Sequence, residues 1–230
     1  MIEELAAQAW AFRAQVEREA AARFARLAEE IAAFDPGSPV PALMRAAADD
    51  ERRHVALCAA LAGAADQAAP AGDTRLAPRS FGAREAALYE TVAACCITET
   101  ESVATVASLL AEDALPRVRE ALHEIARDEI GHAQLGWAHL AREAQALDAG
   151  FLAPHLPAML AGAADSELFV PGPELPELLR HGVLPLSQKR SVFVSTLLEV
   201  IFPGLEQHGI STAPARAWLA ERSSPSAPRG

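Results

Sequence analysis

Residues 118–140 read VREALHEIARDEIGHAQLGWAHL. Apolar or small side chains recur every three or four residues in this stretch, as they do along one face of a helix. The face consists of Val118, Leu122, Ile125, Glu129, His132, Gly136 and Leu140. Its two polar members are three positions apart, so a helix places them one turn apart on the same side. A carboxylate and an imidazole arranged in this way can reach one cation.

The same Glu-x-x-His spacing occurs at Glu51 and His54 and again at Glu120 and His123. Spacing alone is weak evidence because both residue types are common, so helical phase must decide between the copies. The first copy lies on an otherwise core-like row, which comprises Leu43, Ala47, Glu51, His54, Cys58 and Leu61. The copy at Glu120 is about half a turn away from the apolar face of its helix, so we predict that it faces water.

Two such motifs leave a pair of divalent cations under-neutralised, so the partner helices should supply further carboxylates. Glu17 is the only charged residue on the row Trp10, Ala14, Glu17, Ala21, Phe24, Ala28, Ile31. Glu99 is the only charged residue on the row Leu88, Val92, Cys95, Glu99, Val103, Val106, Leu110. Glu19 and Glu101 lie on poorer rows and are second choices. Neither inward row carries a matching Arg or Lys, which disfavours the alternative of an ordinary helical bundle with ion pairs in its core and no metal.

Helix-breaking residues separate four long helical stretches. Alanine and leucine dominate the composition and aromatic residues make up only 5%, which favours an all-α protein. Clusters of Pro, Gly and Asp at 35–39 and 112–116 predict turns, and the Ala-, Pro- and Gly-rich stretch 63–80 predicts a long crossover. The predicted helices cover about 3–34, 40–61, 83–111 and 116–147.

Position along the helices agrees with helical phase. Residues of an antiparallel hairpin meet at one level when they are equally far from its turn. The midpoint of 17 and 51 is 34, beside the first turn, and that of 99 and 129 is 114, inside the second. Four inward carboxylates are therefore predicted at one level, where burial without a cation would cost several kcal/mol each.

Ten of the sixteen prolines follow residue 148, so this part should form short helices and loops. A longer helix is predicted at about 187–202, lying against the bundle. The predicted division is a bundle at 1–147, a helical extension packed on it at 148–222, and a disordered tail at 223–230.

Charge and composition exclude several classes of partner. The formal net charge of −11 disfavours a nucleic-acid partner. The first residues lack the basic start and apolar run of a signal peptide, and the apolar run 191–205 is too short to span a membrane. Three cysteines do not form a disulfide framework. We therefore expect a soluble, cytoplasmic protein with reduced thiols and no membrane partner.

The twofold Glu…Glu-x-x-His pattern resembles that of the ferritin-like di-iron carboxylate superfamily over about residues 3–147. The resemblance implies an antiparallel four-helix bundle with a long connection between helices 2 and 3. It implies two bound iron ions, with manganese as the alternative. The implied ligands are Glu51 and Glu129 as bridges, Glu17 and Glu99 as terminal ligands, and His54 and His132 as nitrogen ligands. Asp50 and Asp128 precede the motif glutamates, and the resemblance makes them candidates for orienting the histidines.

Oxygen-rich ligation with two imidazoles suits Fe(II) or Mn(II) better than zinc. The resemblance thus predicts an oxidoreductase of oxidase or monooxygenase type that activates O2 or peroxide and acts on a small-molecule substrate with an electron donor. One alternative is a ferroxidase, iron-handling or peroxide-scavenging protein, and a second is a non-catalytic helical interaction protein. A homodimer is compatible with each of these readings.

Several other residues are assigned no part in the site. Cys58 and Cys95 stand one turn from predicted ligands but are interpreted as buried packing residues. The only tyrosine, Tyr89, is ten residues from Glu99 and too far along the helix to act there. The remaining histidines are interpreted as surface or loop residues; they are His139, His155, His181 and His208.

Overall fold

The structure is a computed structural model that describes residues 1–63, 75–164 and 168–223, and every regular element in this part is helical. The long helical stretches are α1 (Ile2–Phe34), α2 (Val40–Ala62), α3 (Ala83–Thr91), η1 (Val92–Glu99), α4 (Thr100–Leu110) and α5 (Pro116–Glu143). The later ones are η2 (Ala149–His155), α6 (Leu156–Ala163), η3 (Pro176–His181), α7 (Leu186–Thr196), η4 (Leu197–Ile201), α8 (Phe202–Gln207) and α9 (Ala213–Ser223). The prediction of an all-α fold is confirmed.

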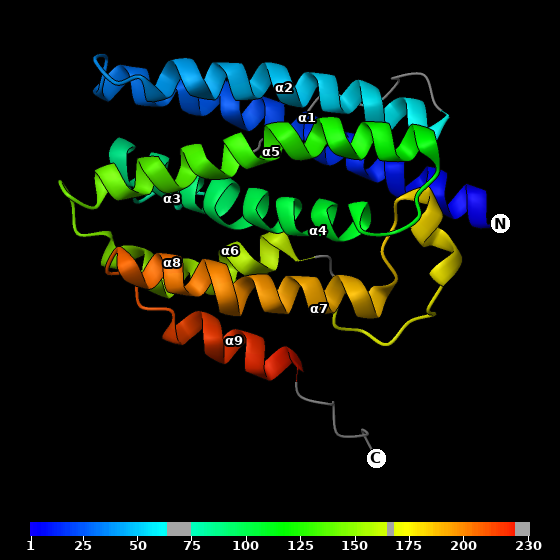
Figure 1. Cartoon of the computed structure of the whole chain (residues 1–230). Helices are drawn as coiled ribbons and strands as arrows, with labels where there is room; N and C mark the ends of the chain where they lie inside the picture. The colour runs from blue at the N-terminus through cyan, green and yellow to red at the C-terminus, as the bar shows by residue number, and fades with distance from the viewer. Residues whose placement is uncertain (64–74, 165–167, 224–230) are drawn as a thin grey trace.

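Two helical hairpins form the larger part of the molecule (Figure 1). In the first, α1 and α2 lie side by side along most of their length and are joined at the proline-rich turn 35–39. In the second, α3, η1 and α4 form one continuous rod, and α5 returns along it. Contacts between α2 and α5 and between α1 and α3 join the two hairpins. The four predicted helices therefore exist, although α5 ends four residues before the predicted 147.

The rod of the second hairpin contains a π-helical segment, η1, in its middle. A π-helix bonds each residue to one five positions away, so it widens the turn and shifts the phase of the residues that follow. The predicted inward row continues through Val103 and Leu110, but both are only partly buried, and Leu109 is buried instead. Beyond Glu99, the last residue of the π segment, the row prediction was therefore wrong for Val103 and Leu110 but right for Val106, which is fully buried.

A second rod, α7–η4–α8, runs from Leu186 to Gln207 and lies along α4. The sequence predicts its end at 202 because of Pro203. The helix continues, because the π-helical segment Leu197–Ile201 ends two residues before Pro203, and its wider turn accommodates a residue that has no N–H. The predicted tail also begins too early, since α9 extends to Ser223. The rest of that tail, and residues 64–74 of the predicted crossover, lie outside the described residues.

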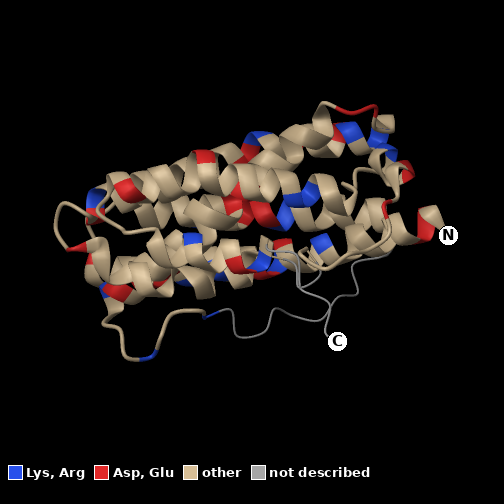
Figure 2. Ribbon diagram, turned by 90° about the horizontal axis from the view of Figure 1, so that it is seen from below, with Lys and Arg blue, Asp and Glu red and all other residues tan. Residues whose placement is uncertain are grey.

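Buried apolar residues of the described chain form three clusters, of which the first joins the outer side of the second hairpin to the later helices, while the other two lie within the two hairpins. Of these two, one contains Phe24, Leu27 and Met44, and the other contains Trp10 and Leu122. Acidic positions on neighbouring helices gather between the ends of the molecule, with basic positions beside them (Figure 2). A layer of charged side chains at mid-length thus separates the two apolar clusters that lie within the hairpins.

One helix in the described part of the chain is long and apolar enough to cross a membrane. It is the rod Ala83–Leu110, with a mean hydropathy of 1.2 over its most apolar window. Half of that window is buried inside the protein, and the core helix of a soluble protein passes the same test. Glu90 and Glu99 of this rod are buried against other parts of the chain. The sequence analysis overlooked this rod, and the absence of a membrane partner remains a prediction.

Glu90 fixes the chain that enters the second hairpin. Its side chain is fully buried, and its carboxylate accepts hydrogen bonds from the backbone N–H groups of Leu76 and Ala77. Arg26 of α1 donates to the same carboxylate at 3.1 Å. One side chain therefore joins α1, α3 and the end of the connection between the hairpins.

Replacing Glu90 by alanine should lower the free energy of unfolding by about 3–5 kcal/mol, because it leaves two backbone donors without their acceptor and removes one of the two carboxylates that Arg26 contacts. Denaturant unfolding followed by circular dichroism measures the change. Glu29→Ala is the matched control, since Glu29 pairs with Arg45 at the surface and should cost at most about 1 kcal/mol. Equal losses in the two variants would contradict the anchoring role.

Candidate metal centre

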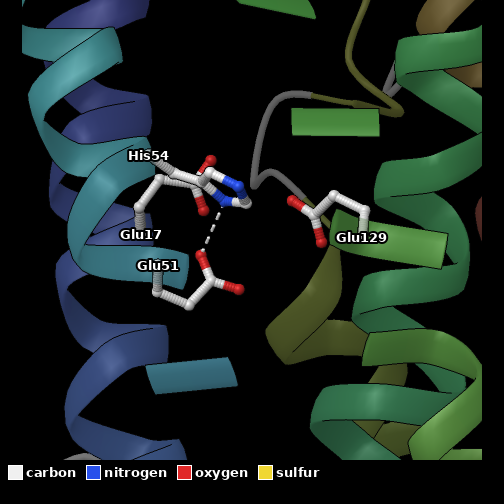
Figure 3. Close-up of side chains that lie close together, drawn as sticks. All are labelled: Glu17, Glu51, His54 and Glu129. Carbon is white, nitrogen blue, oxygen red and sulfur yellow. Dashed lines mark hydrogen bonds and ion pairs between the residues drawn. The ribbon is translucent and has the colours of Figure 1, made fainter. Parts of the chain in front are cut away.

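All six side chains predicted as ligands meet at mid-length of the two hairpins, and none is more than 5% exposed. They form two overlapping groups, in each of which one ligand atom per residue lies within 4.8 Å of the others. The groups are Glu17, Glu51, His54 and Glu129, and Glu51, Glu99, Glu129 and His132. Figure 3 shows the first group, with Glu129 reaching from α5 toward the side chains of α1 and α2.

Glu51 and Glu129 belong to both groups, whereas each of the other four residues belongs to one. Two cation positions that share two carboxylates are the pattern of a dinuclear carboxylate centre. The structure therefore contains a buried carboxylate and histidine cluster that could hold metal.

Both histidines direct the same ring nitrogen into the cluster. His54 Nδ1 lies 3.1 Å from Glu51 Oε2, and His132 Nδ1 lies 2.9 Å from Glu51 Oε1. The outward nitrogens contact aspartates of the opposite hairpin. His54 Nε2 lies 3.3 Å from Asp128 Oδ2, and His132 Nε2 lies 3.3 Å from Asp50 Oδ2.

The pairing is crosswise, because each aspartate precedes the motif glutamate of one helix and contacts the histidine of the other. Arg53 lies between the two aspartates, with Nη1 2.7 Å from Asp50 Oδ1 and Nη2 3.0 Å from Asp128 Oδ2. Burial opposes ionisation of Asp128, but hydrogen bonds from Arg127 and His54 outweigh it and lower the pKa of this carboxyl. An ionised Asp128 accepts the Nε2 hydrogen and leaves the Nδ1 lone pair of His54 for a cation.

Three buried atoms of the cluster have no hydrogen-bond partner within the described part of the chain: Glu51 Oε1, Glu129 Oε2 and His132 Nδ1. His132 Nδ1 nevertheless lies 2.9 Å from Glu51 Oε1 and 3.7 Å from Glu129 Oε2. The atoms approach one another without the alignment of a hydrogen bond. Buried polar atoms are rarely left in this state, and a cation among them would satisfy all three. The donor set therefore fits a metal.

Crowding of carboxylates perturbs their ionisation. Burial raises the pKa of Glu99 well above its usual range, and the charge of neighbouring Glu129 raises it further. Burial also raises the pKa of Glu17 to about 7, although Arg13 acts in the opposite direction. For Glu129 the effect of burial is outweighed by its interactions with the neighbouring Glu99, His132 and Arg13 side chains, which lower its pKa to about 2. The metal-free cluster therefore retains protons on some of its carboxyl groups.

The sequence analysis missed the guanidinium group of Arg13, which reaches the cluster. Arg13 Nε donates to Glu17 Oε1 at 2.7 Å, and Nη2 lies 3.5 Å from Glu129 Oε1. Arg13 also donates to Ser102 Oγ, which donates in turn to Glu129 Oε1 at 3.1 Å. Arg13 does not lie on the inward row, but it precedes Glu17 by four residues. That i, i+4 spacing was the available signal.

Other expectations have mixed outcomes. Glu120 and His123 are exposed, so the prediction for the third motif copy is confirmed. Cys58 and Cys95 are buried, and burial raises the pKa of each thiol to about 12. Neither belongs to a group of metal-binding atoms within the described residues.

The interpretation of His139 as a surface or loop residue was wrong. It lies on α5, one helical turn before the buried Glu143, and is only 2% exposed. His155 is half-buried and packs edge-to-face with Phe81 and Tyr89.

No protein-family model matches the chain, and a sequence search of curated proteins gives no match. The interpretation of the centre therefore depends on its own geometry.

Metal binding at neutral pH should release protons and become tighter as pH rises. Burial disfavours the charged form of His132, but the nearby carboxylates of Glu129 and Glu51 outweigh it and raise its pKa to about 10. The ring is protonated at pH 7 in the metal-free protein, whereas a ligand Nδ1 must be free. We expect about one proton from His132 per centre filled, besides those from the carboxyl groups.

Binding calorimetry in buffers of different ionisation enthalpy measures this release, and His132→Gln should reduce it. The raised pKa of His132 also makes the folding stability of the metal-free protein depend on pH. A histidine with a raised pKa contributes stability below pH 6.5, and this contribution is lost as pH rises toward 10. Metal uptake at pH 7 without proton release would contradict the assignment.

Proposed function

We propose that α1, α2, the α3–η1–α4 rod and α5 form a ferritin-like four-helix bundle, and that the bundle holds two iron ions. Two antiparallel hairpins with a long connection between them support the fold assignment. The observation that carries the metal assignment is the pair of four-residue groups that share Glu51 and Glu129. Each group offers three carboxylates and one imidazole, a donor set that suits Fe(II) or Mn(II) better than zinc.

Glu17, Glu51, His54 and Glu129 would hold one ion, and Glu51, Glu99, Glu129 and His132 would hold the other. Asp50 and Asp128 orient the histidines through Nε2, so that Nδ1 stays directed inward. The two apolar clusters on either side of the charged layer, one containing Phe24 and Met44 and the other Trp10 and Leu122, exclude water along the helix axes. The ligands and the two aspartates are the residues on which metal affinity should depend.

We further propose that the protein is a non-haem di-iron oxidoreductase, with di-manganese as the alternative, that acts on a small substrate. The bound ions would supply activation of O2 or peroxide. The protein's own groups would hold the ions and exclude bulk water, and Glu17 and Glu99 would carry protons only in the metal-free cluster. The rod α7–η4–α8 covers α4 and is the element best placed to separate the substrate from solvent.

Elemental analysis combined with an O2-consumption assay tests this proposal. The purified protein should bind about two iron ions per chain, and the Fe(II)-loaded protein should consume O2. Glu120→Ala, in the exposed copy of the motif, is the matched control and should change neither value. Near-zero metal in the unmutated protein would favour a non-catalytic helical interaction protein instead.

A protein that oxidises and stores Fe(II), or one that scavenges peroxide, would share this metal centre. Helices after residue 148 make the chain longer than a simple bundle and favour the small-substrate reading. Size-exclusion chromatography separates the storage reading from ours, because a large hollow assembly would favour iron storage.

A further inference from the structure

Arg13 is a cation at the border between the proposed metal centre and solvent. Its side chain is 21% exposed, while the two carboxylates that it contacts are nearly inaccessible. The guanidinium therefore reaches inward from the surface between α1 and α4, where Ser102 supplies a hydroxyl beside it.

Charge balance changes when the proposed centre fills. Four ligand carboxylates balance two divalent cations, so the charge of Arg13 is then left over. The aspartates behind the histidines do not balance it, since they contact Arg53 and Arg127. Glu101 of α4 also lies close to Arg13, but Lys189 of α7 interacts with the same carboxylate. The charges of Glu101 and Lys189 cancel, so they do not change the net charge around Arg13. A partly buried site with one excess positive charge favours an anionic ligand.

Metal binding should also make the N–H groups of Arg13 available to an anion. Without metal, Arg13 donates to Glu17 and lies close to Glu129. Cations bound to those carboxylates would withdraw negative charge from them, which weakens their bonds to the guanidinium. A planar guanidinium that loses a carboxylate partner is suited to bind another carboxylate in a bidentate manner.

We propose that Arg13 and Ser102 form an anion-binding subsite beside the metal ions, and that the substrate carries a carboxylate that this subsite holds. The inference rests on the proposed function, because the excess charge arises only when two metal ions are bound. Arg13 selects for charge, and the Ser102 hydroxyl donates to the bound carboxylate in place of Glu129. Neutral substrates of the same size would lack this anchor.

Acetate binding to the Mn(II)-loaded protein tests the proposal. The probe is sodium acetate, added at constant ionic strength and followed by the EPR spectrum of the bound Mn(II). Loss of one charge-assisted hydrogen-bonding partner should weaken acetate binding by at least about tenfold in Arg13→Gln. Arg13→Lys keeps the charge but not the planar fork, so its affinity should lie between those of Arg13→Gln and the parent. Acetamide, which is neutral, should bind all three proteins equally weakly.

Arg45→Gln is the matched control, because it removes the same charge from an exposed ion pair with Glu29 and should leave acetate affinity unchanged. Metal content is measured first in every variant. Two ions per chain with equal acetate affinity in the parent and Arg13→Gln would overturn this inference alone. Absence of metal from the parent would overturn the proposed function and this inference with it.

Discussion

Replacing Gly136 by alanine is expected to destabilise the protein by about 3 kcal/mol or more. Gly136 lies on α5 where this helix crosses η1, and a Cβ added there would lie 2.2 Å from Cys95 Cβ and 3.0 Å from the Cys95 carbonyl carbon. The atoms contacted belong to the backbone and the first side-chain carbon, so no rotamer change can relieve the overlap. The two helices must move apart, which a close-packed interior resists.

Thermal unfolding should show a fall in Tm of about 6–12 °C for Gly136→Ala in a chain of this length. Gly131→Ala is a matched control on the same helix, because Gly131 is exposed and a Cβ there meets nothing within 4 Å. It should stabilise the protein by about 0.5–1 kcal/mol through the higher helix propensity of alanine. A Gly136→Ala protein as stable as Gly131→Ala would show that α5 and η1 are farther apart than the structure indicates.

The crossing at Gly136 also affects the metal centre. It joins the two helices that carry Glu99 and Glu129, with Cys95 about one turn from Glu99 and Gly136 about two turns from Glu129. Separation of these helices would draw apart residues whose ligand atoms now lie within 4.8 Å of one another. We therefore expect Gly136→Ala to weaken metal binding as well as folding, an effect that a glycine remote from the centre would not have.

The sequence alone was sufficient for much of the helical framework. Proline and glycine at 35–39 and 112–116 end helices for reasons that need no tertiary context. The places where prediction failed are those where tertiary packing outweighs local propensity. Both π-helical segments are of this kind. A wider π turn has no signature in the composition, but it changes the helical phase of every residue that follows it. Pro203 is the clearest case, since a helix continues through it.

The convergence of six residues could be predicted because phase and level along a helix are properties of spacing. Contacts between side chains on different helices could not be predicted in this way. Asp50 and Asp128 were candidates from their positions before the motif glutamates, but that each contacts the histidine of the opposite hairpin depends on how the hairpins pack. Arg13 was missed because a long side chain can reach a site that its Cα does not face. His139 was misjudged because an isolated histidine has no motif that reports its burial.

Metal stoichiometry should distinguish the two kinds of carboxylate in the centre. Glu51 and Glu129 belong to both groups of ligand atoms, so Glu51→Ala or Glu129→Ala removes a ligand from both cation positions. Metal content should fall from about two ions per chain to near zero in either variant. Glu17 and Glu99 each belong to one group, so Glu17→Ala or Glu99→Ala should retain about one ion.

The comparison is informative because all four variants delete the same group from the same buried layer. A general loss of fold would lower metal content in all of them alike, whereas shared ligation predicts two classes. Circular dichroism of each metal-free variant checks that the helices persist, and removal of one of several crowded carboxylates should not weaken them, since it relieves like-charge repulsion. Loss of both ions in Glu17→Ala, or retention of one in Glu51→Ala, would mean that the cations are not arranged around the two shared glutamates.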